Sequence, residues 1–90
     1  MPPEFEHDPT KSLANLGKHG LTLAEAEKLW LDPRRHYQPT PPKDGETRFK
    51  ITARLEGQLW TCVFTLRAGT HRLISCRRAW KSEGNAYHLR

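Results

Sequence analysis

The hydrophobic positions in the first third of the chain recur at helical spacing. Asp8-Pro9 has the form of a helix start, with an N-cap residue followed by proline at the first helical position. Leu13 and Leu16 supply an apolar side for this helix, and Gly20 is suited to end it. The pattern therefore predicts a first helix whose leucines face the core.

A second helix is predicted directly after the first. Thr22 and Glu25 form a T-x-x-E capping box, and Leu21 can pack onto Ala26 as a hydrophobic staple. Further apolar residues follow at helical spacing until Asp32-Pro33 ends the helix, namely Leu23, Leu29 and Trp30. The segment 34–47 then holds three prolines and a glycine, which excludes a helix and predicts extended chain followed by a loop.

From residue 48 the apolar residues alternate with polar ones, which is the period of a half-buried strand. Segments 48–55 and 58–67 flank Glu56-Gly57 and predict a hairpin with a two-residue turn. Ala68-Gly69-Thr70 is expected to turn the chain into a third strand, 71–78, before a short helix over 79–88. This order predicts a single α+β domain, residues 1–90, with two N-terminal helices on an antiparallel meander that has room for edge strands.

The two turns determine which residues face one another across the predicted strands. The first turn places Ile51 opposite Cys62, and a three-residue second turn places Arg67 opposite His71. Side chains alternate between the two faces of a sheet, so one face is predicted to form the core beneath the helices. Its members are Phe49, Ile51, Ala53, Trp60, Cys62, Phe64, Leu66, Ile74 and Cys76, with Arg72 and Arg78 toward its ends.

The opposite face is predicted to be basic and rich in hydroxyl groups. Guanidinium groups bind phosphate oxygens through paired hydrogen bonds, and hydroxyls add further bonds without reading sequence. Three interpretations of this face remain open: a surface for a phosphate backbone, a surface for an acidic protein, and an ordinary solvated face. The residues expected there are Arg48, Lys50, Thr52, Arg54, Thr61, Val63, Thr65, Arg67, His71, Leu73, Ser75 and Arg77.

The charge distribution is compatible with a binding surface and equally with a solvated basic surface. Residues 1–47 hold six Lys and Arg against eight Asp and Glu, a net charge of −2, whereas residues 48–90 hold nine against two, a net charge of +7. A basic half of this size favours a polyanion or an acidic partner. No apolar run approaches the ~20 residues of a membrane span, and the N-terminus lacks the features of a signal peptide. We therefore expect no membrane contact, a cytoplasmic location and two reduced cysteines.

The sequence resembles the BrnT family, the ribonuclease toxins of bacterial type II toxin–antitoxin modules, which have a RelE-like fold. The blocks LGKHGLTLAEA, from residue 16, and TLRAGTHRLISCRRA, from residue 65, carry the resemblance. The matching positions are Phe5, Glu6, Asp8, Lys11, Asn15, Lys18, His19, Gly20, Glu25, Ala26, Asp32, Pro33, Glu46, Arg48, Gly57, Thr65, Arg67, Arg72, Ile74, Ser75, Arg77, Ala79, Glu83 and Tyr87.

The resemblance implies an endoribonuclease that arrests translation and is neutralised by a BrnA-like antitoxin. It also implies that the pair represses its own operon, so that the toxin meets operator DNA only through the antitoxin. Cleavage of this kind needs no metal or other cofactor. A base takes the proton of a ribose 2′-OH, the alkoxide attacks the adjacent phosphate, and cations stabilise the charge that develops on the phosphate oxygens.

Three residues are predicted to be catalytic. Arg67 and Arg77 lie on the predicted open face and match arginines of the family, which suits them to stabilise charge. His19 matches a family motif and is the candidate base, although a histidine before Gly20 can equally cap the end of a helix. Residues expected to bind RNA are Lys18, Arg48, Lys50, Arg54, His71 and Arg78.

Other roles remain open at this stage. Glu83 and Tyr87 are expected either to pack the last helix or to close the site. A metal site is not expected, because both cysteines are predicted to face the core and no pair of histidines has ligand spacing. The alternative function is a non-catalytic, toxin-derived module that binds RNA or only an antitoxin.

Overall fold

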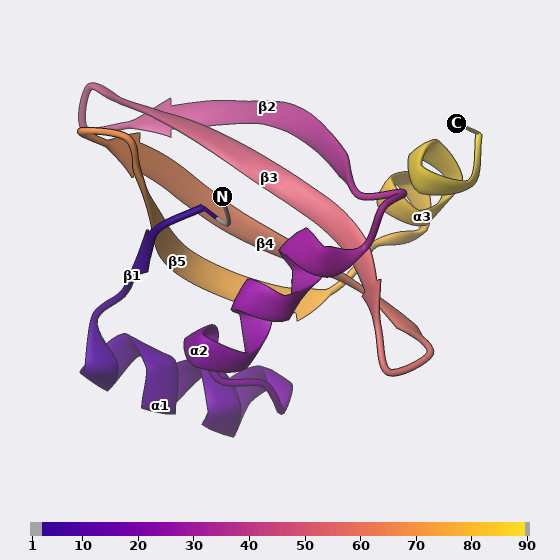
Figure 1. Ribbon diagram of the computed structural model, residues 1–90, viewed down its shortest axis with the longest axis horizontal. Coiled ribbons are helices and arrows are strands. Elements are labelled where there is room, and N and C mark those ends of the chain that lie inside the picture. Colours follow the sequence, from indigo (N-terminus) through magenta and orange to yellow (C-terminus); the bar gives the residue numbers. More distant parts are fainter. Residues whose placement is uncertain (1–2, 90) are drawn as a thin grey trace.

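The chain folds around a five-stranded sheet. A computed structural model describes residues 3–89 and shows an α+β fold (Figure 1). The strands follow the order β1-β5-β4-β3-β2 across the sheet, with β1 parallel to β5 and all other neighbours antiparallel. The predicted meander is confirmed, with two further strands at its edges. The bounds are β1 (Phe5–Glu6), β2 (His36–Lys43), β3 (Glu46–Leu55), β4 (Gln58–Arg67) and β5 (Thr70–Arg78).

Helices cover both sides of the sheet. Helices α1 (Pro9–His19) and α2 (Leu23–Ala26) lie together on one side, and α3 (Lys81–His88) lies on the other (Figure 1). The predicted capping box of Thr22 and Glu25 is present. The second helix is shorter than predicted, because after α2 the chain tightens into a 3₁₀ turn, η1 (Glu27–Leu31). No helix in residues 3–89 is long and apolar enough to cross a membrane.

The orientation of α1 differs from the prediction. Ser12 and Asn15 are buried against the sheet, whereas Leu13 is 70% exposed and Leu16 is 44% exposed. The reason is the free edge of β5, which pairs with β1 only at residues 71 and 72. There the Asn15 amide donates to the Cys76 carbonyl (2.8 Å) and accepts from the Cys76 N–H (2.9 Å). Helix α1 therefore docks by satisfying strand backbone, and the prediction that its leucines face the core is wrong.

The register between β4 and β5 also differs in part. Cys62 pairs with Cys76 as predicted, but the second turn contains only Ala68 and Gly69, so that Arg67 pairs with Thr70. A bulge compensates by leaving Ile74 without a partner, and Phe64 pairs with Leu73. The slip of one residue brings Thr70 from the predicted turn into the strand and reverses the faces of residues 71–73. His71 and Leu73 lie on the core face, and Arg72 lies on the opposite face, contrary to the predicted placements.

The core lies between the sheet and the α2–η1 segment. The indole of Trp30 meets the rings of Phe5 and Phe64 edge to face, with centroids 5.0 and 5.1 Å away. Both cysteines are free and buried, and their hydrogen bond together with burial raises the pKa of the Cys62 thiol. The buried apolar residues are Leu21, Leu23, Ala26, Leu29, Trp30, Ile51, Ala53, Cys62, Phe64, Leu73 and Cys76.

Candidate functional site

The outer face of the sheet, opposite the core, holds most of the predicted basic residues. Helix α3 contacts this face at Thr61 and Arg77, toward the β3–β4 turn, whereas Arg67 lies at the opposite end of β4, beside the Ala68-Gly69 turn. The register places the following side chains on the outer face: Arg48, Lys50, Thr52, Arg54, Thr61, Val63, Thr65, Arg67, Arg72, Ser75 and Arg77.

Beneath α3, the Glu83 carboxylate organises a polar cluster. Its side chain is 1% exposed and accepts hydrogen bonds from Lys50 Nζ (2.9 Å) and from both terminal nitrogens of Arg77 (2.7 and 2.9 Å). Thr61 Oγ1 and the Trp80 N–H also donate to it, at 2.9 and 2.8 Å. We call these five residues the Glu83 cluster. It holds two cations and one carboxylate, so it retains a net positive charge.

The electrostatics of this cluster fix the charge of Glu83. Burial opposes ionisation, but the hydrogen bonds from Arg77, the Trp80 N–H, Lys50 and Thr61 together lower the pKa of Glu83 to about 2. The carboxylate is therefore charged at neutral pH. It is too weak a base to accept a hydroxyl proton readily, and it holds no proton to donate. Its chemical role is to orient Arg77 and Lys50.

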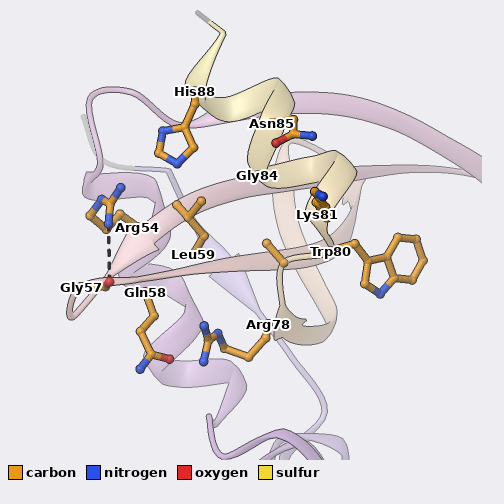
Figure 2. Close-up of a pocket in the computed structure, with 11 residues that line it drawn as sticks. Arg54, Gly57, Gln58, Leu59, Arg78, Trp80, Lys81, Gly84, Asn85 and His88 are labelled. Carbon is orange, nitrogen blue, oxygen red and sulfur yellow. Dashed lines mark hydrogen bonds between the residues drawn. The ribbon is translucent and has the colours of Figure 1, made fainter.

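Trp80 completes the cluster from the start of α3. Its indole lies against the Arg77 guanidinium, with the Arg77 Cζ 3.6 Å from the ring centroid, and Lys50 Nζ lies 5.6 Å from the same centroid. The Trp80 side chain is nevertheless 59% exposed and projects away from the helix (Figure 2). A flat aromatic ring thus stands in solvent beside two cations.

Arg67 lies at the other end of the outer face. Its guanidinium forms an exposed ion pair with Glu46, with Nε and Oε2 2.9 Å apart, and Arg72 forms a similar pair with Glu6 at 3.4 Å. Arg77 pairs across the sheet with Thr61, six residues along β4 from Arg67. At ~3.3 Å per residue the two arginines are about 20 Å apart along the strand direction.

His19 and Lys18 lie apart from both the Glu83 cluster and Arg67. They end α1 and line a cavity of about 250 Å³ against β5, together with Ser75. Gly20 follows in the left-handed conformation (φ 82°) and closes the helix. The three predicted catalytic residues are therefore not gathered at one point. His19 lies at the edge of β5, Arg77 lies in the Glu83 cluster, and Arg67 lies at the far end of the outer face.

The remaining predicted RNA-binding residues divide between the faces. His71 packs among the rings of Phe5, Trp30 and Phe64 at centroid distances of 5.5–5.6 Å, and burial lowers the pKa of its imidazole. Its expected place on the outer face was wrong. Arg48, Lys50 and Arg54 lie on that face as predicted, with Arg54 over the ring of Tyr87 near the end of α3, whereas Arg78 is exposed at the end of β5, over the ring of Trp60.

Sequence reasoning missed the organising residues of this face. The sequence predicts that Glu83 packs the last helix or closes the site, and it gives no sign that Trp80 belongs to the site. One signal for Glu83 was available, since it stands three residues after Trp80, at the position from which a carboxylate reaches back to the N-cap N–H of a helix. Its partners Lys50 and Thr61 lie far from it in the sequence, so no local spacing of residues predicts these contacts.

Metal ligands are not gathered anywhere in the part of the chain that the structure describes. Residues 3–89 contain no group of three or more His, Cys, Asp or Glu side chains placed to hold a metal ion. The charged groups of the outer face are instead guanidinium, ammonium and isolated carboxylate groups.

Comparison with known proteins bears directly on this arrangement. No curated protein matches the chain. A family model described as the ribonuclease toxin BrnT of type II toxin–antitoxin systems matches residues 7–83. The matched range includes α1, all of β2 to β5 and the whole Glu83 cluster. The chain therefore belongs to the BrnT family of ribonuclease toxins, whose partners are an RNA substrate and an antitoxin.

Proposed function

We propose that this BrnT protein is a metal-independent endoribonuclease that acts in the cytoplasm and arrests translation. A BrnA-like antitoxin neutralises it, and the complex represses the operon, with the antitoxin making the DNA contacts. The observation that carries the proposal is the Glu83 cluster, in which a buried carboxylate fixes two cations on the outer face of a ribonuclease-family fold.

The cluster is suited to stabilise a phosphate in the transition state. Two cations against one carboxylate leave a net positive charge, and the Lys50 ammonium has three donors, of which Glu83 takes one. Arg77 is held at two nitrogens, so its position is fixed before RNA arrives. Preorganised charge of this kind stabilises developing negative charge without reorganisation, and it requires no metal ion.

We propose His19 as the base that removes the 2′-OH proton. His19 and Ser75 line the same cavity, and Arg77 follows Ser75 on the outer face of β5. An RNA strand that crosses β5 would pass both His19 and Arg77. The attacking hydroxyl would lie toward α1 and the phosphate toward the Glu83 cluster.

Arg67 would bind the RNA backbone farther along the sheet. Its pair with Glu46 is exposed, and exposed ion pairs contribute little to stability because water screens them. A phosphate can therefore displace Glu46 at little cost. With Arg67 about 20 Å from Arg77, the two would contact phosphates several nucleotides apart.

One observation favours the alternative function. Arg67, Arg72 and Arg77 are each paired with a carboxylate of the same chain, which leaves less guanidinium free for RNA than an open basic face would. A non-catalytic module that binds only its antitoxin would show the same pairing. Cleavage measurements separate the two functions.

The test is cleavage of a defined RNA by purified, folded protein in the presence of a metal chelator. We expect Arg77→Ala to lower the cleavage rate at least ~100-fold, the effect of losing one transition-state donor. Arg77→Lys should recover part of the rate, because lysine restores the charge without the planar fork. His19→Ala and Arg67→Ala should also slow cleavage. Lys43→Ala, which removes an exposed charge at the end of β2, is the matched control and should cleave normally.

Three outcomes would count against the proposal. Loss of wild-type cleavage on chelation would contradict metal independence. Full activity of both Arg67→Ala and Arg77→Ala would place the active site elsewhere. Absence of cleavage by the wild-type protein, with antitoxin binding intact, would support the non-catalytic alternative.

A further inference from the structure

A second cationic region lies beside the outer face, between α3 and the β3–β4 turn. It is a recess of about 350 Å³ at whose rim stand Arg54, Arg78, Trp80, Lys81, Asn85 and His88 (Figure 2). Three of these side chains carry a permanent positive charge and none is a carboxylate. We call this region the α3 recess.

Within residues 3–89, no ion pair joins a carboxylate to Arg78 or Lys81 of the α3 recess, in contrast to Arg67, Arg72 and Arg77. Arg78 lies over the ring of Trp60, 5.6 Å from its centroid, and Arg54 lies over the ring of Tyr87 at 6.0 Å. Aromatic faces hold a guanidinium in place without cancelling its charge. Asp32 accepts from the Arg54 backbone N–H and from the Tyr87 hydroxyl, and its carboxylate also attracts the Arg54 guanidinium, so part of the Arg54 charge is offset.

Trp80 lines the α3 recess and also contacts the Glu83 cluster, and its indole projects outward from the recess, away from Arg78 (Figure 2). One face of its ring is occupied by the Arg77 guanidinium, and its backbone N–H is fixed by Glu83. The ring is therefore held in place while most of its surface remains in solvent. A fixed, exposed indole beside cations matches what single-stranded nucleic acid requires, which is a stacking surface for a base next to positive charge for the backbone.

We propose that the α3 recess binds the RNA strand flanking the cleavage site, with Arg78 and Lys81 on phosphates and Trp80 stacked on a base. This inference rests on the proposed function, since it assigns a subsite to the same substrate. An acidic protein segment would also suit the cations, but it would leave the exposed indole without a partner of matching shape.

The test uses a single-stranded 2′-O-methyl oligoribonucleotide, which lacks the attacking hydroxyl and so reports binding without cleavage. Affinity is measured against salt concentration. We expect Lys81→Ala and Arg78→Ala each to weaken binding several-fold and to reduce the slope of log K against log salt by about 0.7, the value for one lost phosphate contact on a single strand. The matched control Lys43→Ala should leave both affinity and slope close to the wild type.

Trp80 gives an independent readout. Trp80→Ala should weaken binding about ten-fold while the salt slope stays unchanged, because stacking involves no counterion release. Trp80→Phe should retain part of the affinity, which also guards against a general loss of structure. This separation of affinity from slope distinguishes stacking from charge.

The outcomes separate this inference from the proposed function. Recess variants that bind the oligonucleotide like Lys43→Ala overturn the inference, even if the wild type cleaves the corresponding 2′-OH RNA. Recess variants that keep RNA affinity but lose the antitoxin also overturn it, because the occupant would then be an acidic protein. A wild type that binds through the recess but cleaves no RNA supports the inference and contradicts only the endonuclease activity.

Discussion

The two faces of the sheet are covered in chemically opposite ways. On the inner face, Trp30 and Leu29 of η1 pack against buried side chains such as Phe64 and Ile51, and apolar burial is continuous. On the outer face, α3 docks through the Glu83 carboxylate, and the buried strand residues beneath it are threonines. The inner face thus depends on the hydrophobic effect, and the outer face depends on charge and hydrogen bonds.

This difference links stability to function on one face only. Apolar burial is insensitive to pH and to ligands, whereas a charge network responds to both. The cations that hold α3 in place are the ones that we propose for phosphate binding. The outer face should therefore be the part of the fold that acid, substitution and RNA affect most.

The largest expected effect follows removal of the central carboxylate. Glu83→Ala leaves Arg77 and Lys50 close together without their shared counterion, and breaking a buried pair in this way costs about 4 kcal/mol. We expect that loss in the free energy of unfolding, measured by urea denaturation. Glu46→Ala is the matched control, since it removes the carboxylate of an exposed arginine pair, which water screens, and should lower the free energy of unfolding far less. Equal losses would show that the Glu83 cluster is no better shielded from water than the surface pair.

Acid should lower the free energy of unfolding through the same carboxylate, by nearly as much as Glu83→Ala does. The folded-state pKa of Glu83 is about 2, below its ordinary value of 4.5. Its contribution is therefore complete above pH 4.5 and is lost as the pH falls toward 2, which amounts to about 3 kcal/mol over that window. Denaturation curves at stepped pH would show this slope. Glu83→Gln should lack most of it and retain only the part due to Asp32, Glu25 and Glu46, whose pKa values are also lowered.

Much of the fold could be predicted from the sequence because local signals agreed. The Glu56-Gly57 turn fixed the β3–β4 register, with Ile51 opposite Cys62. The β4–β5 register failed because Leu73 and Ile74 are both apolar, so either one satisfies a core position and alternation cannot reveal the bulge. Ala68 also adopts φ 50°, a conformation that its residue type gives no reason to expect.

The site was less predictable for a different reason. Basic residues could be assigned to a face, but their partners could not. Glu83 lies 33 positions from Lys50 in the sequence, and no periodicity joins them. The placement of α3 decides the partner of Arg77, the placement of β1 decides that of Arg72, and the β3–β4 pairing brings Glu46 to Arg67.

The docking of α1 extends the comparison to the edge of the sheet. Asn15→Ala removes hydrogen bonds to the Leu21 carbonyl and to both backbone groups of Cys76, and leaves those groups buried without partners. We expect a loss of about 2 kcal/mol in the free energy of unfolding. Leu13→Ala, on the exposed side of the same helix, should change it by about 0.5 kcal/mol or less. A larger effect of Leu13→Ala would mean that the leucines, not Asn15, hold the helix.

The two threonines beneath Glu83 should differ in their contributions to stability, and their ranking is the informative result. The Thr61 hydroxyl donates to Glu83 Oε1 (2.9 Å), so its single proton is used there. The 2.8 Å contact between the two hydroxyls must then be donated by Thr52. Thr61→Val removes a bond to a charged group and should cost about 2 kcal/mol, whereas Thr52→Val removes a neutral bond and should cost about 1 kcal/mol.

Thr61→Val should also raise the pKa of Glu83 and move acid unfolding to higher pH, while Thr52→Val should leave that midpoint nearly unchanged. Equal costs and equal acid midpoints would mean that both hydroxyls bind Glu83 to the same extent, and the direction of this hydrogen-bond chain would be wrong.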